Sequence, residues 1–384
     1  MSDAFIEPEQ RVSPLELFFD LVFGFAFAQV TTFWVDHRSW TGLGQGLLVL
    51  AVLWWVWASF AWLTNTANTE ADVVLVVMLL ATACLFVAAL AVPAAFDTYR
   101  LTFGIMSFAV LAAFVGLYAM VSKGQPDQLA AVLRMARTVV PAAALILAAA
   151  FVPSAGRPVL WTVAFLVGFI GPQLGGLGGW RVSPSHFVER HGLILIIAMG
   201  ESLSAIGFAA RGAHLGVGVT SAAVLGLIVA ASFWMGYFDF ASSGIGSLLA
   251  DRSGEERIAL ARDAYTYCHL PMVVGILLFA FAMRTMLTRP SSDLSVIPAV
   301  ALCCSSALYL LAFIAIRWRV SRKVGVGRPI AAAVFALLTP AAVFVPAIGA
   351  LAMVAAVWLG LHTYEIVWWH EERARRRSHA PDVR

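Results

Sequence analysis

The chain has 384 residues, of which 61% are hydrophobic and only 12% are charged, and its mean hydropathy is +0.86. A soluble domain averages about 45–50% apolar and about 25% charged residues. A buried core cannot use this much apolar surface, so the composition excludes a soluble domain and predicts helices that face lipid. The formal charge of +3 is modest. The sequence contains no basic patch with interleaved aromatic residues, so it predicts no nucleic-acid partner.

Windows of about 20 apolar residues predict an all-α, polytopic membrane bundle of about twelve transmembrane helices in one integral membrane domain, 1–384. The first apolar run follows an acidic leader, so we expect it to stay in the membrane rather than be cleaved as a signal peptide. Pro340, Pro346 and Gly349 predict a kink or a tight turn between the last two spans. The predicted spans are 14–34, 43–63, 73–93, 100–121, 133–152, 158–178, 189–209, 217–239, 265–287, 294–316, 328–348 and 349–369.

The distribution of positive charge predicts the orientation of these spans. With twelve spans, both termini and all even-numbered connections lie on one side, and about 19 of the 25 lysines and arginines fall there. Positive residues favour the cytoplasmic side, so both termini are predicted to be cytoplasmic. The basic tail, 370–384, is expected to contact anionic lipid at that surface.

Two short matches indicate an internal duplication. Arg-Val-Ser-Pro occurs at 11–14 and again at 181–184, and Ala-Ser-Phe occurs at 58–60 and at 231–233. Six spans per half would make 11–180 and 181–369 two parallel repeats, related by an axis along the membrane normal. Chance is the alternative, because Ala, Ser and Phe are frequent in membrane helices.

Each Arg-Val-Ser-Pro sequence leads into an apolar helix that carries ionisable groups. A charged side chain at the centre of a spanning helix costs at least about 2.5–3.5 kcal/mol, so such residues usually have a function. Ser13 and Glu16 fit a capping box, which is a purely structural role for Glu16. Asp20 lies one turn deeper, where capping cannot explain it, and it must point into the bundle.

In the seventh span, Ser183 and Pro184 again fit the N-cap and first position of a helix. Glu189 and Arg190 follow within two turns, where an interfacial ion pair or a snorkelling arginine is the structural interpretation. Glu201 is eleven residues beyond Arg190, about 16 Å deeper, near mid-membrane. Function is therefore favoured over structure for Glu201.

The remaining ionisable residues are predicted to gather in the cytoplasmic half of the membrane, with Glu201 as the deepest. Tyr237 and Asp239 end the eighth span, and Tyr265 and His269 begin the ninth. This asymmetry predicts a polar cavity that is open to the cytoplasm.

Several of these segments resemble the bacterial low temperature requirement protein A (LtrA) family. They are SPLELFFDLVFGFAFAQ, WWVW followed by Asn65, HFVERHGLILIIAMGES, Tyr237-Phe238-Asp239 and the stretch with Tyr265 and His269. The resemblance runs in order over nearly the whole chain and implies a multi-pass protein of the bacterial inner membrane. The chain departs from the family in the acidic loop after the second span, which here is only Thr69-Glu70-Ala71-Asp72. The family's motif positions correspond to Glu16, Asp20, His186, Glu189, Arg190, His191, Glu201, Tyr237, Asp239 and His269.

Three classes of function remain open. The first is a transporter or channel for a small solute or ion, in which these residues bind substrate or relay protons. The second is an intramembrane enzyme acting on a lipid or prenyl substrate, with Glu16, Asp20, His186, Glu189 and His269 as a possible metal or acid–base set. The third is a non-catalytic membrane component in which buried charges fix helix register. The sequence has no zinc signature, and it identifies neither a cofactor nor an oligomeric state.

Overall fold

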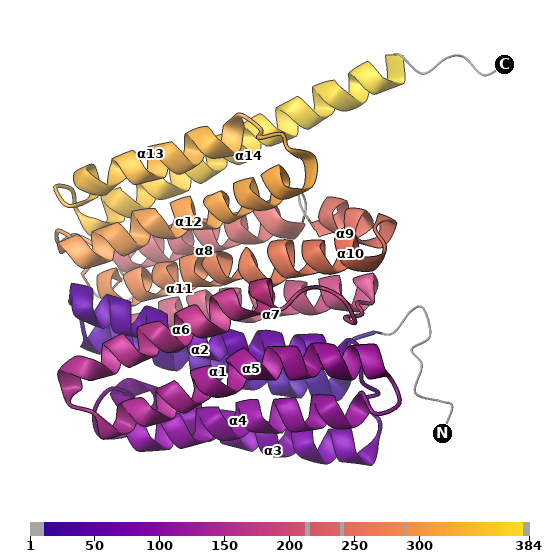
Figure 1. The fold of residues 1–384 in the computed structure, drawn as a ribbon. Helices are drawn as coiled ribbons and strands as arrows, with labels where there is room; N and C mark the ends of the chain where they lie inside the picture. The colour runs from indigo at the N-terminus through magenta and orange to yellow at the C-terminus, as the bar shows by residue number, and fades with distance from the viewer. Residues whose placement is uncertain (1–10, 212–215, 239–241, 288, 379–384) are drawn as a thin grey trace.

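The computed structural model describes residues 11–211, 216–238, 242–287 and 289–378. This part of the chain forms a bundle of helices that run side by side (Figure 1) and contains no β-sheet. The helices are α1 (Pro14–Asp36), α2 (Trp40–Thr64), α3 (Asp72–Ala91), α4 (Arg100–Val121), α5 (Pro126–Ala148), α6 (Arg157–Leu174), α7 (Pro184–Ala210), α8 (Val217–Phe238), α9 (Ser242–Asp251), α10 (Gly254–Leu260), α11 (His269–Met286), α12 (Val296–Ser321), α13 (Gly327–Ala342) and α14 (Ala347–Ser378). Short 3₁₀ turns are η1 (Val92–Ala94), η2 (Ala149–Phe151) and η3 (Ser154–Gly156), and a π-helical turn, η4 (Ala261–Tyr267), joins α10 to α11.

Eleven segments of the described chain are long and apolar enough to cross a membrane, and α13 is a shorter apolar helix. The predicted fold class, a polytopic helical membrane bundle, is therefore confirmed. The predicted break between the last two spans is present at residues 343–346 rather than at 348–349. α13 has 16 residues, or about 24 Å of helix, which is shorter than a hydrocarbon core of about 30 Å.

The starts of α1 and α7 follow the predicted local chemistry. In α1 the Ser13 hydroxyl accepts from the backbone N–H of Glu16, and the Glu16 carboxylate accepts from the backbone N–H of Ser13, so the predicted capping box is present. α7 also begins with proline after a serine N-cap, but there the serine side chain makes no capping bond. Its third residue, His186, bonds to the neighbouring helix instead.

The helices before and after residue 180 occupy different halves of the bundle (Figure 1). The order in which helices contact one another is the same in the two halves. α1 packs on α2 and α3, as α7 packs on α8 and α11. The series α3–α4–α5–α6 corresponds to α11–α12–α13–α14, and the pair α2–α6 corresponds to α8–α14. A duplicated chain would produce this arrangement, with α1 equivalent to α7.

α1 and α7 pack against each other as parallel helices. Hydrogen bonds join Glu16 to His186, Asp20 to Arg190 and Thr31 to Glu201, and each pair is 170 residues apart. In a pair of antiparallel helices, the sequence separation of the bonded residues would change from one pair to the next. This sequence separation of 170 residues equals the separation between the two Arg-Val-Ser-Pro sequences, which begin at 11 and 181. If 11–180 and 181–369 are repeats, the contact between them brings corresponding residues face to face.

Candidate functional site

Four buried side chains form an ionic cluster between α1 and α7. Arg190 donates from Nη1 to Glu16 Oε1 and from Nη2 to Asp20 Oδ1, the latter at 2.9 Å. His186 Nε2 lies 3.1 and 3.2 Å from the two Glu16 carboxylate oxygens. The side chains of all four are at most 1% exposed. These four residues are called the ionic cluster below.

α2 completes the surroundings of the ionic cluster. The Trp57 indole Nε1–H donates to Asp20 Oδ1 at 2.9 Å, and Arg190 also donates to the hydroxyl of Thr64. Asn65, which caps the end of α2, reaches the start of α7. Glu16, Asp20 and Arg190 are thus held by three helices, which explains how charges can be buried here without contact with water.

The hydrogen bonds of Asn65 define the tautomer of His186. The backbone N–H of Ser183 donates to Asn65 Oδ1 at 2.7 Å, which fixes the orientation of the amide. Asn65 Nδ2, 3.1 Å from His186 Nδ1, must then be a donor, so Nδ1 accepts. The remaining ring N–H, on Nε2, donates to Glu16. This pattern describes a neutral imidazole.

The charges of the ionic cluster do not balance when both carboxylates are ionised. Glu16 and Asp20 contribute two negative charges, Arg190 contributes one positive charge, and a neutral His186 contributes none. One net negative charge is left in a buried place. Asp20 Oδ2 has no hydrogen-bond partner among the described residues, so it is the free acceptor at which one proton or one cation could bind.

A second group of buried polar rings lies beside the ionic cluster. His191 contacts the rings of Trp57, Tyr265 and His269, with centroid separations of 4.8, 5.1 and 5.2 Å. His269 Nε2 accepts from the Tyr237 hydroxyl at 3.0 Å. His191 Nε2 and the Tyr265 hydroxyl have no hydrogen-bond partner within the described part of the chain. Unsatisfied buried polar atoms often mark a water or ion position.

Glu201 belongs to a separate polar layer. Its Oε1 accepts from the Thr31 hydroxyl at 2.6 Å, and Arg284 of α11 donates to Thr31 at 3.2 Å and to Thr32 at 2.8 Å. Eleven residues separate this layer from the ionic cluster on both helices, or about 16 Å. Buried apolar side chains fill the space between them, including Phe23, Phe27, Ile194 and Ala198.

Two expectations about depth and access need correction. α7 begins at Pro184, as Ser183-Pro184 predicted, and runs to Ala210, so Glu201 lies past the middle of the helix, toward the end opposite the ionic cluster. Glu201 therefore does not belong to the polar half that the sequence predicted. The predicted cavity open to the cytoplasm is also absent around Glu16 and Asp20, because both side chains are buried in protein.

The structure brings together most, but not all, of the candidate residues. Glu16, Asp20, His186 and Arg190 form the ionic cluster, and His191, His269 and Tyr237 lie in the adjacent ring group. Glu189 is exposed on α7 and accepts from the backbone N–H of Val12 at 3.3 Å. Asp239 lies outside the described residues.

The described residues do not form the metal site that the enzyme interpretation would need. Glu189 is on the surface, and His269 is bonded to Tyr237 rather than to a carboxylate. Within the described ranges, no group of three or more His, Cys, Asp or Glu side chains is arranged to hold a metal ion.

Sequence reasoning missed Trp57, Thr64, Thr31 and Arg284 as site residues. Arg284 could have been found by the same criterion as Asp20, because it is a charge inside an apolar span. Trp57 and the two threonines carry no such signal. Their types are common in membrane helices, and only the packing of α1, α2, α7 and α11 gives them charged partners.

Comparison of the sequence with known proteins identifies the family of this chain. The chain is 28% identical over 295 residues to an uncharacterized protein of Rhizobium meliloti (strain 1021), which covers 73% of this chain and 71% of the relative. No solved structure matches the chain. The family model of the bacterial low temperature requirement A protein (LtrA) matches residues 11–363, a range that includes the ionic cluster, the ring group and Glu201. The chain therefore belongs to the bacterial low temperature requirement A protein family.

Proposed function

We propose that this protein is an ion-coupled transporter of a small solute in the bacterial inner membrane, and that the ionic cluster holds the coupling proton or cation. The observation that carries the proposal is the charge balance described above. Two carboxylates and one guanidinium, with a neutral imidazole, leave one negative charge uncompensated in a buried site. Binding of a single positive charge would neutralise it.

The position of the ionic cluster also supports transport. In transporters built from two repeats, coupling sites lie where the repeats meet, and the repeats move against each other around them. Here the paired residues come from α1 and α7, the helices that join the two proposed parallel halves, 11–180 and 181–369. The closed packing around the ionic cluster corresponds to an occluded state in this proposal, and release to the cytoplasm would require α1 and α7 to separate.

Purified protein in proteoliposomes would test the proposal. An imposed membrane potential or pH gradient, with a panel of small solutes, should produce proton or cation movement followed by an entrapped indicator dye. Asp20→Asn keeps the shape of the side chain but removes the charge, so we expect it to abolish the coupled flux. Arg137→Gln is the control, because Arg137 is exposed on α5. Coupled flux that is unchanged in Asp20→Asn would overturn the proposal.

A second candidate, a structural role for the ionic cluster, is favoured by its complete burial and by the three helices that Arg190 connects. Buried ion pairs often add little net stability but are costly to break. Asp20→Asn separates the two candidates. A folded, thermally stable variant without flux supports transport, whereas parallel loss of stability and flux supports a structural network.

A further inference from the structure

A cavity of about 80 Å³ lies between α2, α5, α6 and the π-helical turn η4, separate from the ionic cluster. It has room for several water-sized groups and is partly open to the surface of the bundle, so a ligand longer than the cavity can extend out of it. Most of its lining is apolar or aromatic, and the aromatic part consists of Trp55, Trp62, Trp180 and Tyr267. Trp62 and Trp180 meet edge to face, with ring centroids 5.6 Å apart. Such a lining suits the apolar body of a ligand.

The charged residues that line this cavity are arginines. Arg134 and Arg262 take part in the lining, and among the described residues no acidic side chain does so. Arg262 shares the carboxylate of Asp263 with Arg319, at 2.9 and 2.7 Å, so two guanidinium groups have one acidic partner. The group of Arg262, Asp263 and Arg319 therefore keeps one net positive charge, and Arg262 is its member that lines the cavity.

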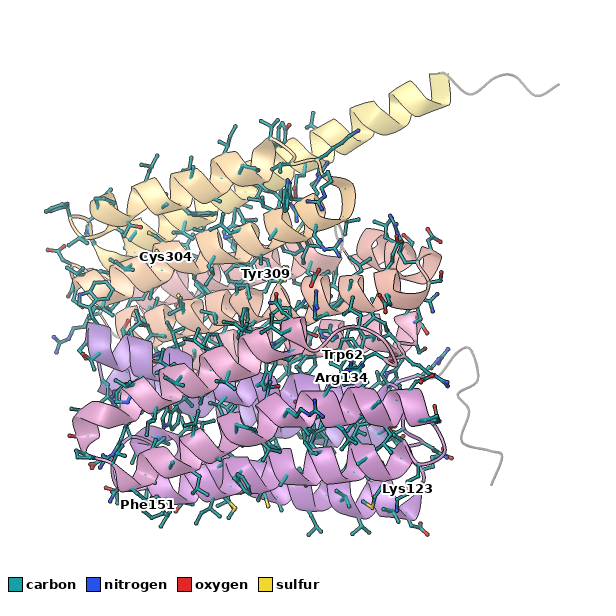
Figure 2. The ribbon with its side chains drawn as sticks, in the orientation of Figure 1. Trp62, Lys123, Arg134, Phe151, Cys304 and Tyr309 are labelled. Carbon is teal, nitrogen blue, oxygen red and sulfur yellow. The ribbon has the colours of Figure 1, made fainter. Side chains whose placement is uncertain are left out.

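Arg134 is the less compensated of the two arginines. It lies eight residues into α5, about 12 Å along the helix, and lines the same cavity as Trp62 (both are labelled in Figure 2). Its Nε donates to the carbonyl of Gly175 at 2.9 Å and its Nη2 donates to the carbonyl of Gly178, both neutral acceptors. Glu255 approaches Gly178 from α10 but does not line the cavity.

Two further features of the lining are unexplained by packing alone. The indole Nε1–H of Trp55 is buried and has no hydrogen-bond partner among the residues that the structure describes. η4 supplies Arg262, Thr266 and Tyr267 as a π-helical turn. π-helical turns inside α-helices occur frequently at functional sites.

We infer that this cavity binds an amphiphile with an apolar chain and an anionic oxygen head group, a phosphate or a carboxylate, which Arg134 and Arg262 hold. Arginine forks bind such groups through paired charge-assisted hydrogen bonds. The aromatic walls accept the adjoining apolar chain. The head group can come from a membrane lipid or from a soluble anionic compound. This inference does not depend on the transport proposal.

The cavity is connected to the ionic cluster through α2. The Thr266 carbonyl accepts from Trp54 and the Thr266 hydroxyl accepts from Trp62, each at 2.9 Å. Trp54 packs against Trp57 at 4.8 Å between ring centroids, and Trp57 donates to Asp20. A ligand that shifts η4 would therefore also act on the surroundings of Asp20.

Calorimetric titration of the full chain in phosphatidylcholine nanodiscs with dodecyl phosphate tests the inference. We expect saturable binding that Arg134→Gln weakens by roughly tenfold or more, since a hydrogen bond to a charged group is lost. Arg137→Gln, on the same helix but outside the lining, should bind like the parent. Dodecanol lacks the anionic group and should bind the parent and Arg134→Gln equally.

A second variant keeps the test decisive if Arg134→Gln does not fold. Ser59 lines the cavity, and Ser59→Leu should fill part of it and weaken dodecyl phosphate binding. Competition then identifies the source of the head group. Displacement by inorganic phosphate indicates a soluble anion, whereas displacement only by phosphatidylglycerol in the nanodisc indicates a lipid. Equal affinity in the parent, Arg134→Gln and Ser59→Leu would overturn the inference.

Discussion

Replacement of Arg190 by glutamine should destabilise the protein strongly. Arg190 is buried and donates to Glu16, Asp20 and Thr64. Glutamine has no charge, so two carboxylates would remain buried without a cation. Loss of one partner of a buried ion pair costs about 3–5 kcal/mol of unfolding free energy. Because one guanidinium serves both carboxylates, we expect a loss near the upper end of this range.

Titration with sodium dodecyl sulfate in mixed micelles, followed by circular dichroism, would measure this loss. Arg137→Gln is the matched control, and as an exposed substitution it should stay within about 0.5 kcal/mol of the parent. Asp20→Asn in the Arg190→Gln background should restore about 1 kcal/mol or more, since neighbours in one network are coupled. A loss below about 1 kcal/mol for Arg190→Gln, with no coupling to Asp20→Asn, would refute the reasoning.

Three other substitutions, one of them with a matched control, test further contacts. Gly275→Ala should cost about 1–3 kcal/mol in the same titration, because its Cβ would lie 2.6 Å from the backbone oxygen of Ser305, whereas Gly200→Ala meets no atom within 4 Å and should be tolerated. Asn65→Ala should lower the unfolding free energy by about 1–3 kcal/mol, since it removes the bonds to Ser183 and His186; a thermal melt unchanged from the parent would contradict this. Glu201 is a carboxylate inside a membrane span, and we propose that it also lies on the transport path. Glu201→Gln keeps an acceptor for Thr31, so we expect a folded protein by size-exclusion chromatography whose coupled flux is lost in proteoliposomes; full flux would remove Glu201 from this path.

The wrong start predicted for α5 shows where hydropathy alone fails. The apolar window begins at 133, but the helix begins at Pro126, because its first turns are polar and still helical. Arg134 therefore appeared to be near a helix end, although it lies two turns inside and lines a cavity. A hydropathy window measures transfer to lipid, whereas a helix needs only backbone hydrogen bonds and a suitable first residue.

The sequence by itself determined the class of protein, the number of apolar helices to within one, the capping box of α1 and the Ser-Pro start of α7. These properties are local, since they depend on consecutive apolar residues and on Ser-Pro at a helix start. It also identified Glu16, Asp20 and Arg190, because charges inside apolar spans are costly.

Only the tertiary structure decided which partner each charge has. Glu16 meets His186 and Asp20 meets Arg190 because α1 and α7 lie parallel and in register at an offset of 170 residues. The same packing placed Glu201 in a second layer with Thr31 and left Glu189 on the surface. Hydrophobicity is nearly the same on every face of these helices, so it cannot specify which faces meet; the fit of side chains between helices does.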